Sequence, residues 1–375
     1  MKYFVVLLLL VMTIPVLSVS AEGLPETSDD LSELERAVNE EIVNALPPEV
    51  GDRLTDINPL ELTFGGVMAE VWEMLKSEVT RPLQLLVSLV GVIILCAAAN
   101  ALRDSGGGAA KSTAATAAFE IVGVLAGAGL MSAAIAQNVL RTSQTLTAAG
   151  AFMLTFIPIL AGIMAVMGNL ISANLFSTAV VAAAQIFSQI MVMVLMPLSA
   201  SILGVSVAGA VNPDLKTDKL AETVKTITVW VLGFSATIFS ALLGLQSLVA
   251  GNADSVAMKA VKFTISGGVP FIGGAVGDAL GVVNGSVGVL KGTTGAVGMI
   301  AIVMVCLPPI LSTILFRLSL NLAGAVSGLF GTDRLTSLLK SGENVLSVVL
   351  AMLVCFTLIM LVSIALMIRI GTGGV

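Results

Sequence analysis

Long apolar stretches separated by short polar or helix-breaking segments dominate this chain. A membrane-spanning helix needs about 20 predominantly apolar residues, and most of the stretches reach that length. The pattern predicts an all-α, polytopic integral membrane helix bundle of about eight to ten transmembrane helices. Two pieces, 151–167 and 197–211, are short for a crossing. The ten stretches are 82–102, 114–137, 151–167, 171–195, 197–211, 227–250, 266–290, 294–308, 310–328 and 345–368.

The breaks between these stretches are predicted from turn residues and polarity. Gly168-Asn169, Pro197 and Pro308-Pro309 each end an apolar piece, because glycine favours turns and proline interrupts helical hydrogen bonding. A more polar, amphipathic stretch at 138–150 separates the second piece from the third. A loop carrying Arg334 and Lys340 precedes the last span, 345–368.

Residues 22–81 form the one sizeable segment that does not read as membrane. A first helix is expected over about 30–46, with Ile42 and Leu46 on its apolar face and Pro47-Pro48 at its end. A second helix is expected to begin at Asn58 and to carry an apolar stripe that includes Trp72. The stripe is expected to pack within this segment or against a partner.

The first 21 residues have the organisation of a secretory signal. Lys2 precedes an apolar run, and Val19-Ser20-Ala21 provides small residues for cleavage. We expect cleavage after Ala21, which would place the segment 22–81 outside the cytoplasm. An uncleaved membrane anchor is the alternative.

Part of the sequence recurs at an offset of 115 residues. Ala208-Gly209-Ala210-Val211 returns as Ala323-Gly324-Ala325-Val326, and Thr217-Asp218-Lys219-Leu220 returns as Thr332-Asp333-Arg334-Leu335. The matches predict a membrane domain over 82–375 with repeat halves at about 114–226 and 229–341, followed by the span 345–368. Chance similarity between apolar sequences is the alternative. The halves would be parallel with ten crossings, and inverted if one piece in each half is re-entrant.

Composition and charge support the membrane assignment. Apolar residues make up 57% of the chain and charged residues only 11%, whereas soluble domains are about 25% charged. The net charge of −6 is uneven: residues 22–81 hold 15 acidic and 4 basic residues, while residues 82–375 hold 9 and 13. An acidic exported segment before a basic membrane domain fits the positive-inside rule. Since no basic patch exists outside short loops, nucleic-acid binding is not expected.

The residue inventory argues against an enzyme. There is no histidine, the single tyrosine is Tyr3, and Cys96, Cys306 and Cys355 each lie in apolar stretches. Catalytic triads that use histidine are therefore impossible, the cysteines lack metal-ligand spacing, and no Walker A motif occurs. We expect no catalytic residues, no cofactor and no metal.

Five polar side chains within or beside the apolar stretches are candidates for a pore lining or an ion relay. Glu120 and Asp278 lie inside predicted spans, where a charge costs about 3 kcal/mol and must face protein or water. Arg317 needs an acidic partner, for which Asp278 or Glu120 could serve. Asn169 and Asn284 are a repeat-related pair that could cap broken helices. Simple packing or an interfacial position is the alternative for each.

Glycines at four-residue spacing predict close helix packing, because they let another backbone approach. A mobile or discontinuous helix beside a passage is the alternative. The glycines are Gly123 and Gly127 in one span, and Gly273, Gly277, Gly281 and Gly285 in another.

The chain as a whole resembles the stage III sporulation protein AE family. The resemblance rests on the signal, the acidic exported segment, the duplicated polytopic domain, the repeated Thr-Asp-Lys/Arg-Leu stretches and the segment Phe156-Ile157-Pro158. It implies a multi-pass protein of the mother-cell-derived membrane around the forespore. It also implies a place in a channel between the two cells, with a secretion-type ATPase and ring-forming membrane subunits as partners.

Three functional classes follow. The first is a membrane component of that sporulation channel, serving as its permease or export gate. The second is a proton- or ion-coupled secondary transporter of a small solute, and the third is a non-conducting membrane scaffold.

Overall fold

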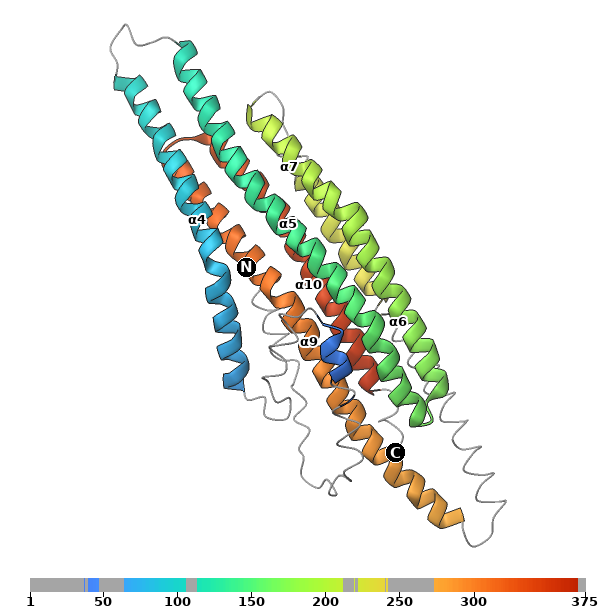
Figure 1. The fold of residues 1–375 in the computed structure, drawn as a ribbon. Helices are drawn as coiled ribbons and strands as arrows, with labels where there is room; N and C mark the ends of the chain where they lie inside the picture. The colour runs from blue at the N-terminus through green and yellow to red at the C-terminus, as the bar shows by residue number, and fades with distance from the viewer. Residues whose placement is uncertain are drawn as a thin grey trace.

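The protein is a bundle of very long helices (Figure 1). The computed structural model describes residues 37, 40–46, 64–105, 113–211, 219, 222–239, 241 and 273–369, and these contain helices and turns but no strand. The all-α prediction is thereby confirmed. Residues 222–239 are helical as well. The principal elements are α4 (Phe64–Ser105), α5 (Thr113–Val166), α6 (Leu170–Ile190), the π-helix η2 (Met191–Leu195), α7 (Met196–Val211), α9 (Gly273–Leu329) and α10 (Asp333–Arg369).

Five helical stretches in the described part of the chain are long and apolar enough to cross a membrane. The division of α5 into two spans around 138–150 is wrong, because α5 runs unbroken for 54 residues. Residues 138–149 contain no proline or glycine that would interrupt the helix. The polar side chains fit within it: the Thr147 hydroxyl donates a hydrogen bond to the Ser143 carbonyl of the same helix, at 2.9 Å. At 1.5 Å per residue, α5 is about 81 Å long, whereas a bilayer core is about 30 Å thick.

The expected proline breaks are also wrong. Pro308 and Pro309 lie inside the 57-residue α9, and Pro197 lies at the start of α7, directly continuous with η2 and α6. Side chains satisfy part of the backbone near these prolines: the hydroxyls of Thr313 and Ser201 donate to the carbonyls of Pro309 and Pro197 at 2.7 and 2.8 Å. Apolar helices tolerate proline where such groups and neighbouring helices take up the freed backbone.

The break at Gly168-Asn169 is confirmed. Gly168 has a φ of 84°, a conformation that L side chains rarely adopt, and it turns the chain between α5 and α6. The expected loop around Arg334 and Lys340 is wrong, because both residues belong to α10. The turn before α10 comprises only residues 330–332, with Gly331 at a φ of 66°.

Two apolar cores follow each other along the bundle. The first core lies between α4, α5, α9 and the start of α10, and contains Leu89, Met131 and Leu346. The second is larger, and joins the later part of α5 to α6, α9 and the rest of α10 around Phe156 and Phe356. Helix α10 is the most buried candidate span, with 72% of its apolar window buried, and α4 is the least, with 22%.

The described part of segment 22–81 contributes to the second core. Ile42 and Leu46 are buried there and the helix ends before Pro47, as the sequence predicts. On the stripe expected for the second helix, Trp72 is 57% exposed, so packing within the segment is wrong there and packing against a partner stays a prediction, while Met74, outside the stripe, is buried. Helix α4 also continues through residues 81 and 82, where the membrane domain was expected to begin. The signal segment lies outside the described residues.

The helix ends fall into two groups at opposite ends of the bundle. The C-terminal ends of α4 and α7, the N-terminal end of α5 and the α9–α10 turn point toward the same end of the bundle (Figure 1). Arg103 and Arg334 lie near those ends, and Arg369 lies at the C-terminal end of α10, which runs the other way. The positive-inside rule predicts Arg103, Arg334 and Lys291 on one side of the membrane, but Lys291 lies 38 residues before the C-terminal end of α9, far from the other two.

Candidate functional site

Buried polar side chains separate the two apolar cores. We call Asn138 and Thr142 of α5 and Ser312 and Thr313 of α9 the polar layer. On each helix they lie between residues of the first core and residues of the second. All four are at most 3% exposed, so the layer crosses the interior of the bundle.

The layer is only partly satisfied by hydrogen bonds. The Thr313 hydroxyl lies 3.0 Å from Asn138 Oδ1 across the α5–α9 interface, and it shares its single hydrogen between this oxygen and the Pro309 carbonyl. Thr142 Oγ1 and Ser312 Oγ are buried and have no hydrogen-bond partner among the described residues. A buried hydroxyl without a partner costs about 1–3 kcal/mol, and a natural chain retains such a cost most readily where polarity serves a function.

Charged pairs lie at the outer edges of the layer. Arg141, three residues after Asn138, lies 3.7 Å from the Glu78 carboxylate of α4. Arg317, four residues after Thr313, contacts Glu343 Oε1 of α10 through Nε at 3.1 Å and through a terminal nitrogen at 3.0 Å. Asn321 of α9 donates to the other oxygen of Glu343 at 3.4 Å.

Lys225 joins the Arg317–Glu343 edge from the helical stretch 222–239. Its ammonium donates to Asn344 Oδ1 of α10 at 2.9 Å. Burial, followed by the nearby Arg317 guanidinium, lowers the pKa of Lys225 below its ordinary value of 10.5, while Glu343 opposes this change. This edge therefore gathers two cations and one carboxylate.

The lowered pKa of Lys225 gives a testable result. Its amine is expected to be acylated with a pH midpoint below 10.5, because burial disfavours the ammonium form. Glu343→Gln should move the midpoint lower still, since it removes a group that stabilises the cation, and Arg317→Gln should move it higher. Mass spectrometry of protein acylated across a pH series measures each midpoint. A midpoint at or above 10.5 would contradict this account.

Arg317 does not pair as the sequence suggested. Its partner is Glu343, which lies opposite because α9 and α10 form an antiparallel hairpin. Asp278 occupies the same unbroken helix as Arg317, 39 residues and thus about 58 Å earlier. The absence of the expected break at Pro308-Pro309 rules out that pairing. Glu120 lies near the start of α5, and its side chain, like that of Asp278, lies outside the described ones.

The two repeat-related asparagines differ in structure. Asn169 precedes α6 in the turn after α5, and its side chain makes no capping hydrogen bond. Asn284 lies within α9, and its side chain is outside the described ones. The capping role is therefore wrong for Asn169 and stays a prediction for Asn284, and the internal repeat stays a sequence observation.

Close packing is observed at two of the predicted glycines. A Cβ on Gly123 would overlap the sulfur of Cys96, and one on Gly127 would lie 2.9 Å from Leu335. Gly285 has open space around it, and Gly273, Gly277 and Gly281 lie where only the helical backbone is described. Gly298 and Gly342 make further close approaches that the four-residue spacing did not indicate.

Sequence reasoning missed Asn138, Thr313 and Glu343. Each lies at the edge of a predicted span or shortly after a proline. Each was therefore assigned to the polar boundary of a span and not to the interior of a helix. A polar residue inside a long apolar helix would have indicated a buried polar site. That signal can be recognised only when the helix is known to continue through the residue.

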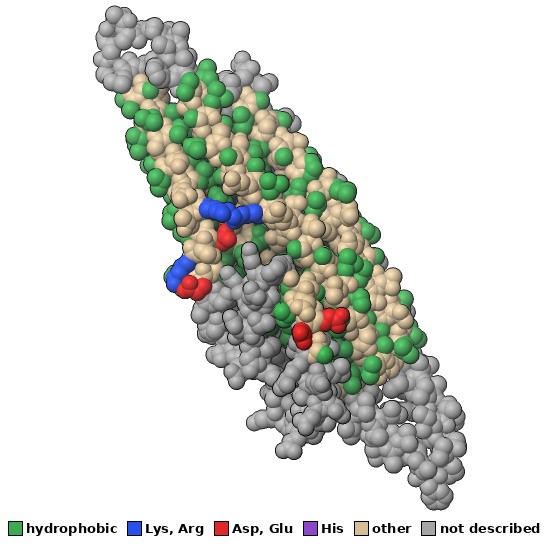
Figure 2. All heavy atoms as spheres, in the orientation of Figure 1, with side chains coloured by type: hydrophobic (Ala, Val, Ile, Leu, Met, Phe, Trp, Pro, Cys, Tyr) green, Lys and Arg blue, Asp and Glu red, His purple; other side chains and the backbone are tan. Residues whose placement is uncertain are grey.

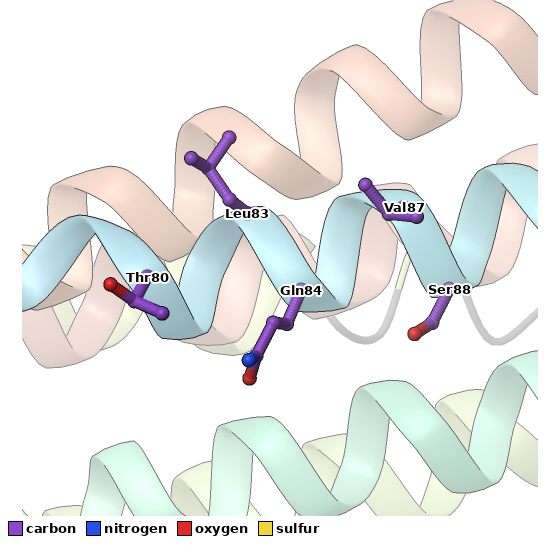
Figure 3. Close-up of a pocket in the computed structure, with 5 residues that line it drawn as sticks. All are labelled: Thr80, Leu83, Gln84, Val87 and Ser88. Carbon is purple, nitrogen blue, oxygen red and sulfur yellow. The ribbon is translucent and has the colours of Figure 1, made fainter.

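A shallow groove of ≈ 410 Å³ lies along α4, beside the Glu78–Arg141 edge (Figure 3). Five residues of α4 line it: Thr80, Gln84 and Ser88 point to one side of the helix, and Leu83 and Val87 point to another. In the described part of the chain, no three His, Cys, Asp or Glu side chains are grouped to hold a metal ion.

The long apolar helices, the exposed large hydrophobic side chains and the internal polar layer define a polytopic helical membrane protein. Residues 49–371 match the family described as stage III sporulation protein AE, and the chain belongs to this family. A relative, stage III sporulation protein AE of Bacillus subtilis strain 168, is 23% identical over 258 residues. The match covers 68% of this chain and 63% of that relative's length. No solved structure matches.

Proposed function

We propose that this protein is an integral membrane component of the channel or secretion complex between mother cell and forespore, and that it forms the permease or export gate of that complex. Family membership supports a role in sporulation, and the apolar helices support a place in a membrane. Within this proposal the protein lies in the mother-cell-derived membrane around the forespore. A secretion-type ATPase and ring-forming membrane subunits are its proposed partners.

The observation that carries the gate function is the polar layer. A scaffold would gain stability by filling this level with apolar side chains, because Thr142 and Ser312 leave hydroxyls without partners. A gate instead requires polar groups inside an apolar bundle, where a hydrophilic cargo or water can replace the missing partners. The charged edges continue this polar level from the α4–α5 contact to the α9–α10 contact.

Co-purification from sporulating cells tests the complex. The tagged protein, extracted in mild detergent, is expected to retain the ATPase and ring-forming subunits in stoichiometric amounts. The same purification from vegetative cells that express the tagged chain alone is the control. Recovery of the protein without those subunits, together with solute uptake by the purified protein in vesicles, would favour a free-standing transporter and overturn the proposal.

The double variant Thr142→Val, Ser312→Ala separates a gate from a scaffold. It should raise thermal stability, by about 1 kcal/mol or more, because two unpaired hydroxyls are removed with little change in volume. The yield of heat-resistant spores should nevertheless fall, since the layer loses its polarity. Thr147→Val, at an exposed hydroxyl of the same helix, is the matched control. A more stable variant with normal spore yield would exclude a functional polar layer.

A further inference from the structure

Charged side chains form a belt across α4, α5, α9, α10 and the helical stretch 222–239 at the level of the polar layer, whereas α6 and α7 contribute none. We define the belt as Lys76, Glu78 and Arg81 of α4, Arg141, Lys225, Arg317 and Glu343, together with the two tryptophans, Trp72 and Trp230. Hydrophobic side chains are scattered over the whole face seen in Figure 2, whereas the charged ones gather in small groups.

Direct contacts fix the belt at one level. Glu78–Arg141 joins α4 to α5, Asn138–Thr313 joins α5 to α9, and Arg317–Glu343 joins α9 to α10. On α5 and α9 the successive contacts are three and four residues apart, which is at most about 6 Å along a helix. Lys225 binds Asn344, the residue next to Glu343.

Both tryptophans lie close to this level and on the same side of it. Trp72 is six residues from Glu78, and Trp230 is five residues from Lys225, so each is within about 9 Å of the charges. Their neighbours Met74 and Leu232 both belong to the second core. Trp72 and Trp230 are 57% and 74% exposed. Tryptophan and cationic side chains collect where a bilayer meets water, because each has an apolar body and a polar tip.

Next to the belt, helical segments long enough to cross a bilayer contain no charged residue. No charged residue occurs in 292–316 on α9, or in 344–368 on α10, and both runs lie on the second-core side of the belt. Each run of 25 residues measures about 38 Å as helix, against about 30 Å for the hydrocarbon core. A helix as long as α5 cannot fit inside one bilayer, so a membrane surface must cross it between its ends.

We propose that the belt is a binding surface for the headgroups of anionic phospholipids. Lys76, Arg141 and Arg317 have carboxylate partners within 4 Å, but no described carboxylate lies that close to Arg81 or Lys225. Arg81 and Lys225 can therefore bind lipid phosphate without breaking an ion pair within the described part of the protein. The buried polar layer then lies level with the membrane surface. This inference does not depend on the nature of the complex, so it can hold even if the gate function fails.

Tryptophan fluorescence tests the level of the belt, because the chain has only two tryptophans. Full-length Trp72→Phe and Trp230→Phe proteins are reconstituted in phosphatidylcholine vesicles whose acyl chains carry bromine near the headgroup or near the methyl end. Each remaining indole should be quenched more strongly by the shallow bromines. Stronger quenching by the deep bromines, or no quenching by either, would overturn the proposal.

Lipid retention tests the anionic preference. Arg81→Gln, Lys225→Gln protein, purified from membranes with phosphatidylglycerol, should carry several-fold less of that lipid by native mass spectrometry. Arg369→Gln removes a cation 26 residues along α10 from Glu343 and should retain the wild-type amount. Equal retention by all three proteins would overturn the proposal. Because both variants can be checked for wild-type thermal stability, failure to fold would not be mistaken for loss of binding.

Discussion

Replacing Gly298 by alanine is expected to destabilise the bundle by about 1–3 kcal/mol, the usual cost of overpacking a core. A Cβ at Gly298 would overlap the ring of Phe156, which is fully buried and stacked on Phe152 with ring centroids 5.3 Å apart. Because the ring has no exposed surface, it can move only by displacing its neighbours. Thermal unfolding in detergent can be followed with a thiol-reactive fluorogenic dye in a Cys96→Ser, Cys355→Ser background, since these two thiols are partly exposed whereas the buried Cys306 becomes accessible only on unfolding.

Two further variants make this prediction specific. Gly292→Ala, on the same helix, meets no atom within 4 Å and should be neutral or slightly stabilising, because alanine favours helices. Adding Phe156→Leu to Gly298→Ala should recover part of the lost stability by making room for the methyl group. Equal melting temperatures for Gly298→Ala and Gly292→Ala would show that α5 and α9 do not meet at this point.

Arg317→Ala is expected to lower stability by about 1–3 kcal/mol and to reduce the yield of heat-resistant spores, because it leaves the half-buried Glu343 carboxylate without its partner. The exchange Arg317→Glu, Glu343→Arg should recover much of both, since the pair is restored in reverse. The same melting assay and spore counts measure the two effects.

An exposed ion pair on α4 provides the control for Arg317. Lys76 and Glu73 are 2.7 Å apart, with both side chains more than half exposed. Lys76→Ala should therefore change stability by about 0.5 kcal/mol at most. If Arg317→Ala behaves like Lys76→Ala in both measurements, the pair with Glu343 is not a structural or functional element of the polar layer.

Some features of the fold could be read from local sequence. Gly168 marked a true turn because a positive φ there needs glycine, and Pro47-Pro48 marked the end of a helix. The burial of Ile42 and Leu46 followed from their spacing on one helical face. Each of these depends on the residue itself or on its neighbours within a few positions.

Other features could not be read in that way. Pro308-Pro309 and the polar stretch 138–150 resembled breaks, yet α9 and α5 continue through them. Tertiary packing overrides local helix-breaking tendencies when neighbouring helices and hydroxyl groups take up the freed backbone. The same error hid the site. Because Arg317 was expected to follow a break, the search for its partner turned to distant acids and passed over Glu343.

The sequence by itself determined that this is an all-helical, polytopic membrane protein, because composition and apolar run length are properties of the chain alone. The family, too, follows from the sequence, through the match over residues 49–371. The tertiary structure decided which polar groups meet. The Asn138–Thr313 and Arg317–Glu343 contacts join helices across 175 and 26 residues of sequence. Whether these residues lie opposite each other depends on the length of each helix before the next turn. The periodicity of apolar residues does not predict that length.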